Sequence, residues 1–283
     1  MSDFSNIVFI SDLDGTLLPD SKVPLEKDME AIRRFKDGGG IFTIATGRII
    51  QAAEQFFDVL KPNAPVILNN GSLIYDTGSK SVLYNRTLDK AAKDYTIALM
   101  ERFPDMGVEI NLPDRIYAVR LNDWERKHLE LTHIPFTEAG IDDIPAEGWC
   151  KVLFSIAHEK MDEVEKYAAS MGWDKANFVT SGDFLFECLP KDTAKGIAMK
   201  ELVKIKNWDG FRIAAAGDYN NDLEMIEYAD IGFAPQNAQE IVKNAADHVT
   251  DADCNRGFIA EAIDHIEKML SLPRTLKSSD LRV

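Results

Sequence analysis

Short apolar runs that each end in small or polar residues dominate the pattern of this chain. They occupy residues 7–10, 41–45, 66–68, 211–216 and 231–234. Runs this short, rich in Ile and Val and apolar on both faces, indicate the strands of a buried parallel sheet. Helical periodicity lies between them, over residues 25–35, 194–205 and 259–270. Alternating strands and helices predict right-handed βαβ units and therefore a doubly wound α/β core.

The segment from Tyr84 to Leu189 has a different pattern. Its strand-like runs, at residues 116–121, 152–157 and 184–189, alternate more openly with polar residues, as in a sheet with one solvated face. Helical stretches lie among them. We therefore predict an α+β domain at residues 84–189, inserted into a Rossmann-like parallel-sheet core made of residues 1–83 and 190–272. Residues 273–283 are predicted to form a polar tail.

Length and charge narrow the class of protein. A chain of 283 residues suits two domains. Its net charge of -15 repels phosphate backbones and anionic lipid, which argues against nucleic acid and membrane surfaces as partners. No apolar run approaches the roughly 18–20 residues of a membrane helix, and the first ten residues do not resemble a signal peptide. Three distant cysteines, Cys150, Cys188 and Cys254, fit a reducing compartment. We expect a cytoplasmic protein.

Polar clusters directly follow the predicted core strands. In an open α/β sheet, ligands bind at the carboxyl ends of the strands, so we expect these clusters to meet in one site. The candidates that could share a site are Asp12 and Asp14, then Thr46, Gly47 and Arg48, then Lys195, and finally Asp218, Asn221 and Asp222. They combine hard oxygen ligands, a hydroxyl donor and a fixed cation.

Each feature by itself has a plainer interpretation. The Asp12-Leu13-Asp14-Gly15 segment is equally typical of a turn. Asp218, Asn221 and Asp222 are equally typical of a helix cap with a charged first turn. A lone Lys195 is typical of a solvated helix residue. The order, the spacing and the position at strand ends together make the pattern specific.

Four segments of the chain, in this order, resemble the motifs of the haloacid dehalogenase superfamily of phosphohydrolases. They are Asp12-Leu13-Asp14-Gly15-Thr16-Leu17, Thr46-Gly47-Arg48, Lys195-Gly196 and Gly217-Asp218-Tyr219-Asn220-Asn221-Asp222. Asn70-Gly71 and residues 234–238 resemble further segments of its Cof-type branch, which carries an α/β cap between the second and third motifs, where the insert lies here. Pro235-Gln236 departs from the Met-Gly that is frequent in the branch, but it changes no group used in the chemistry.

The resemblance implies a role for each motif. Asp12 is implied to attack phosphorus and form an aspartyl-phosphate, and Asp14 to act as general acid and then general base. Mg²⁺ is implied to bind the carboxylates of Asp12 and Asp218 and the backbone carbonyl of Asp14. The implied phosphate-binding residues are Thr46, Gly47, Lys195 and Asn221. Asp222 is implied to orient Lys195 and the metal-bound waters.

The pair of acids narrows the predicted function. Transport ATPases and dehalogenases of this superfamily lack the second acid, so Asp12 and Asp14 together favour a phosphatase or a phosphomutase. We predict a Mg²⁺-dependent phosphatase of small phosphorylated metabolites, with sugar phosphates as the leading class by family analogy. The alternatives are a phosphomutase and a non-catalytic module that binds a phosphorylated ligand.

Residues of the insert are expected to contact the leaving group, because a cap closes over the site. Lys151, together with Arg48 of the core, is our candidate for this contact. A solvated strand residue is an equal alternative for Lys151. His128 and His133 also fall in the insert and are expected at the surface rather than as metal ligands.

Overall fold

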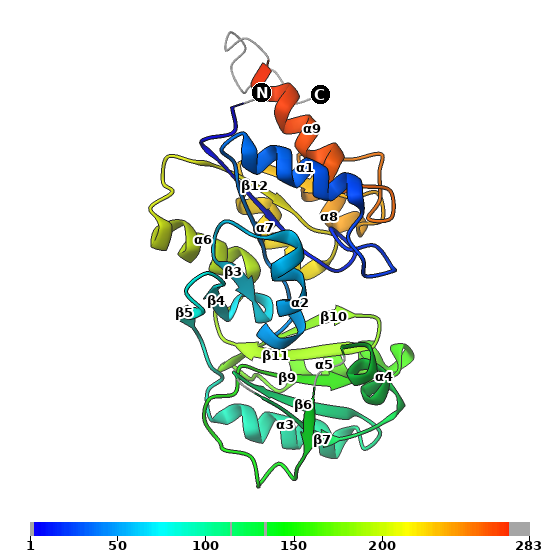
Figure 1. The fold of residues 1–283 in the computed structure, drawn as a ribbon. Coiled ribbons are helices and arrows are strands. Elements are labelled where there is room, and N and C mark those ends of the chain that lie inside the picture. The colour runs from blue at the N-terminus through cyan, green and yellow to red at the C-terminus, as the bar shows by residue number, and fades with distance from the viewer. Residues whose placement is uncertain (1–2, 114, 133–134, 272–283) are drawn as a thin grey trace.

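The parallel sheet predicted from the sequence is present. The structure is a computed structural model that describes residues 3–113, 115–132 and 135–271 (Figure 1). Five strands lie side by side in the order β14-β13-β12-β1-β2, and all of them are parallel. Their bounds are β1 Ile7–Ser11, β2 Ile41–Ile44, β12 Arg212–Ala216, β13 Ile231–Ala234 and β14 His248–Val249. The prediction of a doubly wound α/β core is confirmed.

Helices cover both faces of this sheet. They are α1 (Glu26–Asp37), α2 (Ile50–Leu60), α6 (Lys195–Lys206), α7 (Leu223–Tyr228), α8 (Glu240–Ala245) and α9 (Phe258–Ser271). Phe9 of β1 packs in one hydrophobic cluster with α1 and α9, whereas Val8 and Ile10 pack in another cluster with α6. Because successive side chains of a strand point to opposite faces, each face of β1 contacts its own layer of helices.

The run at residues 66–68 differs from the prediction. It forms β3 (Val66–Leu68), which pairs antiparallel with β4 (Leu73–Asp76), and β4 pairs with β5 (Ser81–Asn85). A single bridge, between Ala45 and Ile67, connects this small sheet to the parallel one. The chain reverses within the short helix η1 (Asn69–Gly71), where Asn70 and Gly71 have φ of 52° and 95°. These left-handed conformations, which Gly and Asn tolerate, place β4 beside β3 instead of starting a crossover helix.

A third sheet occupies the other end of the molecule (Figure 1). Its six strands lie in the order β10-β11-β9-β6-β7-β8 and are antiparallel except for the pair β7–β8. The strands are β6 (Gly107–Leu112), β7 (Arg115–Arg120), β8 (Phe136–Glu138), β9 (Lys151–Ser155), β10 (Ala176–Gly182) and β11 (Leu185–Pro190), and the helices are α3 (Ala91–Arg102), α4 (Asp123–Thr132) and α5 (His158–Ser170). We call residues 88–189 the cap.

The cap sheet has an apolar face and a polar face. Val108 and Phe154 of the apolar face pack with α3 and α5 in a cluster of their own. The open alternation was expected to mean that the other face is solvated, and this is wrong. Glu109, Asn111, Lys151 and Glu187 of that face are buried, because this part of the face is turned toward the strand ends of the parallel sheet, with which it encloses a cavity.

The boundaries of the predicted domains, residues 84–189 against 1–83 and 190–272, stay a prediction. The predicted tail at 273–283 and His133 lie outside the described residues. Among the helices that the structure describes, none combines the length and the apolarity needed to span a membrane.

Candidate active site

The polar clusters after the core strands meet at one edge of the parallel sheet. Asp12 directly follows β1, and its backbone N–H donates to the carbonyl of Ala216, the last residue of β12 (2.9 Å). This bond places the cluster after β12 beside the cluster after β1. Both clusters line a cavity of ≈ 360 Å³ between the parallel sheet and the six-stranded sheet of the cap. The cavity wall also includes Thr46, Gly47, Arg48, Lys195 and Asn221.

A buried ammonium ties two of the aspartates together. Lys195 is the first residue of α6 and is 1% exposed. Its Nζ lies 2.7 Å from Oδ1 of Asp12 and 2.6 Å from Oδ1 of Asp222. Burial alone lowers the pKa of an ammonium, but these two carboxylates raise the pKa of Lys195 above its usual value. Lys195 is therefore a permanent cation held next to Asp12.

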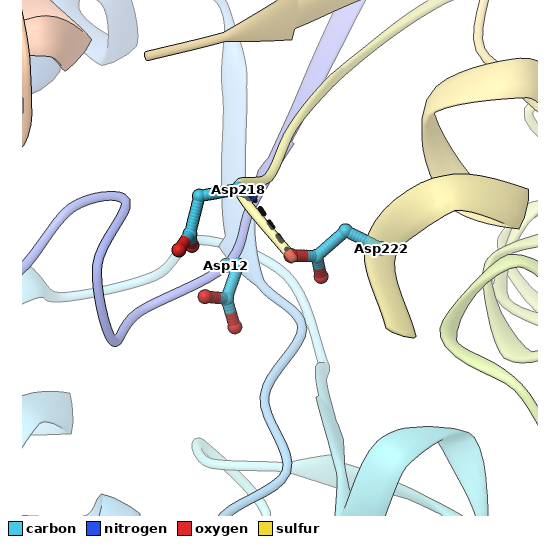
Figure 2. A group of neighbouring side chains, drawn as sticks. All are labelled: Asp12, Asp218 and Asp222. Carbon is cyan, nitrogen blue, oxygen red and sulfur yellow. Dashed lines mark hydrogen bonds between the residues drawn. The ribbon is translucent and has the colours of Figure 1, made fainter. Parts of the chain in front are cut away.

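Asp222 is fully engaged by the protein. Its Oδ1 accepts from Lys195, while its Oδ2 accepts from the backbone N–H groups of Asp218 (3.0 Å) and Tyr219 (3.1 Å). The dashed line in Figure 2 marks the bond between Asp218 and Asp222. Asp222 thus folds the loop after β12 and positions Lys195.

Asp12, Asp218 and Asp222 form a carboxylate group that could hold a cation (Figure 2). One oxygen of each lies within 4.8 Å of the others. Burial and, after it, the charge of Asp222 raise the pKa of Asp218 to about 7. Burial raises the pKa of Asp12 well above its usual value, an effect that Lys195 opposes. Three carboxylates surround one ammonium here, so a further cation would relieve their repulsion.

Asp14 is held by two cations on the same side of the cavity. Arg48 donates from Nε to Oδ2 (2.7 Å) and from a terminal nitrogen to Oδ1 (2.8 Å), and Lys22 donates to Oδ1 (2.8 Å). Burial favours the uncharged acid, but Arg48 and then Lys22 lower the pKa of Asp14 to about 2. Gly15 follows with φ of 84°, and a Cβ there would lie 2.5 Å from Oδ2 of Asp218. Only glycine lets this turn approach Asp218.

Core and cap are joined by a chain of polar contacts. Asn221 donates to Asn70 (2.9 Å), and Asn70 donates to Oε2 of Glu187 in the cap (2.8 Å). Lys151 lies 3.2 Å from Oε1 of Glu187 and 3.2 Å from the carbonyl oxygen of Gly47. Lys151 is 6% exposed, so the alternative of a solvated strand residue is wrong.

Several residues that line the cavity were missed in the sequence. They are Lys22, Glu109, Asn111 and Glu187, whereas Asn70 was named only within a resembling segment and His128 only as a surface residue. The expectation that His128 lies at the surface is wrong: its side chain is 19% exposed, and burial lowers its pKa. Strand β6, which carries Glu109 and Asn111, was not among the expected strands. Its alternation of polar and apolar residues was the available signal.

The comparisons with known proteins agree with this arrangement. The family model of the haloacid dehalogenase-like hydrolases matches residues 9–263. The chain belongs to this family. Its predicted identification with the Cof-type branch and the predicted enzyme class, a phosphoric monoester hydrolase, are confirmed.

Relatives of this haloacid dehalogenase-like hydrolase match along most of their length. The 5-amino-6-(5-phospho-D-ribitylamino)uracil phosphatase YwtE of Bacillus subtilis is 30% identical, and the match covers 90% of this chain and 96% of that protein. The pyridoxal phosphate phosphatase YbhA of Escherichia coli is 24% identical over 87% of this chain and 95% of its own length. A solved haloacid dehalogenase-like hydrolase from Bacteroides thetaiotaomicron superposes with a TM-score of 0.79 at 25% identity, covering 92% and 98% of the two chains.

Proposed function

We propose that this enzyme is a Mg²⁺-dependent phosphatase that passes the phosphoryl group of a small metabolite to Asp12 and then to water. The observation that carries the proposal is the position of Asp12. Its carboxylate lies at the end of β1, 2.7 Å from the buried ammonium of Lys195, and a second acid, Asp14, lines the same cavity. A nucleophile beside a fixed cation and a second acid is the set that two successive phosphoryl displacements need.

In the first step an oxygen of Asp12 forms a bond to phosphorus while the ester P–O bond breaks. Asp14 gives its proton to the departing oxygen. In the second step Asp14 takes a proton from the water that attacks the phosphoryl group, and Asp12 leaves as the carboxylate. Thr46, Lys195, Asn221 and the backbone at Gly47 hold the phosphoryl oxygens throughout.

Asp14 must be protonated to act as the acid of the first step. In the free enzyme Arg48 and Lys22 lower its pKa and keep it ionised. We propose that Arg48 turns from Asp14 to the substrate when the cavity is filled. Because this removes one cation from Asp14, its pKa rises toward the range in which it can donate. Arg48 then contacts the leaving group or the phosphoryl oxygens.

The donor atoms in the site fit Mg²⁺, which prefers oxygen ligands. The carboxylates of Asp12 and Asp218 and the backbone carbonyl of Asp14 would hold the ion. Asp222, the third carboxylate of the group, would lie beside the ion while its oxygens accept from Lys195 and from the backbone N–H of Asp218. When bound, the metal offsets the repulsion between a carboxylate nucleophile and a phosphate dianion.

Sugar phosphates remain the leading substrate class. The relatives named above support small phosphorylated metabolites, one of them with a ribityl chain and one with a pyridine ring. The cavity of ≈ 360 Å³ supports a ligand of that size. A cytoplasmic location and the absence of nucleic acid and membranes as partners stay predictions, which the net charge of -15 supports.

The test is phosphate release from a panel of phosphate esters by the purified protein with MgCl₂. We expect turnover that EDTA abolishes and Mg²⁺ restores, and inhibition by Ca²⁺, whose larger and more flexible shell misplaces the nucleophile. The Asp12→Asn variant should show no turnover and no covalent phosphate. Full activity after exhaustive chelation would contradict the proposal that the enzyme needs Mg²⁺. A phosphorylated Asp12→Asn protein would contradict the proposal that Asp12 is the nucleophile.

Two other outcomes identify the alternatives. An isomerised sugar phosphate without phosphate release would indicate a phosphomutase. Tight binding without turnover across the panel would indicate a module that only binds a phosphorylated ligand.

A further inference from the structure

One buried carboxylate of the cap is hydrogen-bonded to the core. It belongs to Glu187 of β11, which is 3% exposed. Its Oε2 accepts from Nδ2 of Asn70, in the core helix η1, at 2.8 Å. Its Oε1 accepts from Nζ of Lys151 (3.2 Å) and from Oγ of Ser181 (2.8 Å), which both belong to the cap. The bond between Glu187 and Asn70 therefore exists only while the cap is closed over the core.

Asn70 extends this contact to the loop after β12. Its Oδ1 accepts from Nδ2 of Asn221 at 2.9 Å. Asn221 lines the cavity, and the proposed mechanism places it on the phosphoryl oxygens. Three side chains thus form one series of hydrogen bonds that runs from the core to the cap, in the order Asn221, Asn70 and Glu187.

The carboxylate at the end of this series fixes the direction of both amides. An ionised carboxylate only accepts hydrogen bonds, so Asn70 turns its Nδ2 toward Glu187. The oxygen of Asn70 then faces Asn221, and Asn221 turns its own Nδ2 toward that oxygen. With either amide flipped, two acceptor oxygens would face each other without a proton between them. The charge of Glu187 therefore determines the direction of both amides.

The backbone holds Asn70 beside the residues that are expected to bind phosphate. Its N–H donates to the carbonyl of Thr46 at 3.1 Å, and its side chain is buried. A Cβ on Gly47 would lie 2.9 Å from Oδ1 and 3.1 Å from Nδ2 of Asn70. The amide that receives its direction from the cap is therefore adjacent to the loop of Thr46 and Gly47.

The direction of the Asn221 amide decides what it offers to a substrate. An amide nitrogen carries two hydrogens. Asn221 gives one of them to Asn70, and the second is a donor for a phosphoryl oxygen. In a flipped amide an oxygen would take the place of this donor and would repel the phosphoryl oxygens.

We infer that Glu187 is a positioning residue, which orients Asn70 and Asn221 so that Asn221 donates to the phosphoryl group once the cap is closed. Glu187 acts through two amides and touches no reacting atom. The inference rests on the proposed function, in which the phosphoryl group lies at the Asp12 end of the cavity. Because every phosphate ester carries the same phosphoryl group, a change at Glu187 affects all esters alike.

The Glu187→Gln variant reverses the end of the series. Its amide oxygen stays with Lys151, which only donates, so its nitrogen faces Asn70 and both asparagines turn round. We expect kcat to fall about 10- to 100-fold on the best sugar phosphate of the panel and on p-nitrophenyl phosphate alike, the usual cost of losing a group that orients the residues of a site. Glu138→Gln, an exposed cap residue, is the matched control. An unchanged kcat, or a loss confined to the sugar phosphate, would contradict the inference.

A second substitution distinguishes positioning from a general effect on the fold. When Asn70→Asp is combined with Glu187→Gln, the carboxylate and the amide exchange places, and the new carboxylate accepts from both neighbours, so that Asn221 keeps its direction. Asn70→Asp alone sets two carboxylates against each other and should lose activity. We expect the double variant to be more active than either single variant on both esters, with thermal unfolding measured for all three. A double variant no more active than Glu187→Gln would overturn the positioning role.

Calorimetry with inorganic phosphate in MgCl₂ separates this inference from the proposed function. If no ester is turned over, but phosphate binds more weakly to Glu187→Gln and the double variant restores that binding, the phosphatase proposal fails and the positioning role stands. If esters are hydrolysed and Glu187→Gln changes neither kcat nor the affinity for phosphate, the positioning role fails and the phosphatase stands. A wild-type protein that neither hydrolyses esters nor binds phosphate would refute both.

Discussion

The core end and the cap end of the cavity are both built from buried charged groups, but they differ in how these groups are paired. At the core end Lys195 bonds Asp12 and Asp222, and Asp222 also accepts two backbone N–H groups. At the cap end Asn111 donates to one oxygen of Glu109, and the carboxyl of Glu125, whose pKa burial and then the charge of Glu109 raise to about 9, lies against the same carboxylate. The buried acids of the core end therefore lie beside a cation, whereas in the cap a protonated acid, Glu125, lies against an ionised one.

This difference separates two requirements of an enzyme. Groups that act on a developing charge are most effective when they are already oriented, because no reorganisation is then needed during the reaction. Groups of the cap are expected to contact the leaving group, which differs between substrates, so changes there should alter the choice among esters more than the rate on all of them.

The largest effect is expected when the buried cation at the core end of the cavity is removed. Lys195→Met removes the cation between Asp12 and Asp222, so every ester, sugar or aryl, should lose about 10⁴-fold or more in kcat. The variant should also be less stable by about 3–5 kcal/mol, because buried carboxylates lose their partner. Lys204→Met changes an exposed lysine of the same helix and serves as the control. Activity within tenfold of wild type would show that Lys195 does not hold the phosphoryl group.

The second effect depends on the leaving group. Asp14→Asn keeps the nucleophile but removes acid and base assistance, which is worth about 10²–10⁴-fold in rate for an alkyl ester. With p-nitrophenyl phosphate, whose leaving group hardly needs a proton, the variant should release one equivalent of nitrophenol in a burst and then stall. Rapid-mixing absorbance measures this burst, and Asp20→Asn, on an exposed neighbour, is the control. Steady turnover at the wild-type rate would remove Asp14 from the mechanism.

The sequence predicts the core end of the cavity better than the cap end. The meeting of Asp12 and Asp218 was predicted, because both follow parallel strands, whose carboxyl ends share one edge of the sheet. Lys195, 183 residues from Asp12, was expected at the same site although it begins a helix and follows no strand of that sheet. No such rule says what covers a polar face of an antiparallel sheet. The alternation in β6 and β9 is the same whether water or another domain lies opposite. It therefore left Lys151 open between a leaving-group contact and a solvated strand residue, and it did not predict the burial of Glu109.

Contacts between distant segments were missed for the same reason. Asn70 bonds Glu187 across 117 positions, and neither residue type nor spacing indicates this pair. The antiparallel pairing of β3 was also missed, because an apolar run shows that a strand is buried but not which direction its partner takes. The turn at Asn70-Gly71 was the local signal of that reversal.

A smaller and more selective effect is expected at the cap end. Lys151→Ala should lower kcat/KM for the preferred sugar phosphate about 10- to 100-fold, the size of one charge-assisted hydrogen bond. The aryl ester should be hydrolysed almost as before. Steady-state kinetics on both substrates decides this, with the exposed Lys160→Ala as control. Because Lys151 also bonds the Gly47 carbonyl, equal losses on both esters would assign it to cap closure instead of recognition.

The smallest expected effect concerns the ionisation of a buried acid in the cap and its effect on stability. In the core, carboxylates lie beside Lys195, whereas Glu125 of the cap is 0% exposed and has no cation bonded to it among the described residues. Burial, and then the charge of Glu109, raise its pKa to about 9. Between about pH 4.5 and 9 the unfolded chain therefore releases a proton that the folded protein keeps. The free energy of unfolding should fall as the pH rises through this range.

Glu125→Gln removes the titration and keeps the shape, so the variant should lack this fall. At pH 8 it should be more stable than wild type by about 1–3 kcal/mol, and near pH 4.5 the two should converge. Urea unfolding at several pH values measures the difference, and Glu130→Gln, exposed on the same helix, is the control. Hydrolysis of p-nitrophenyl phosphate should not change. A variant that is less stable than wild type by the same amount at every pH would show that Glu125 is ionised in the folded cap, and that the cap, like the core, holds its buried acids charged.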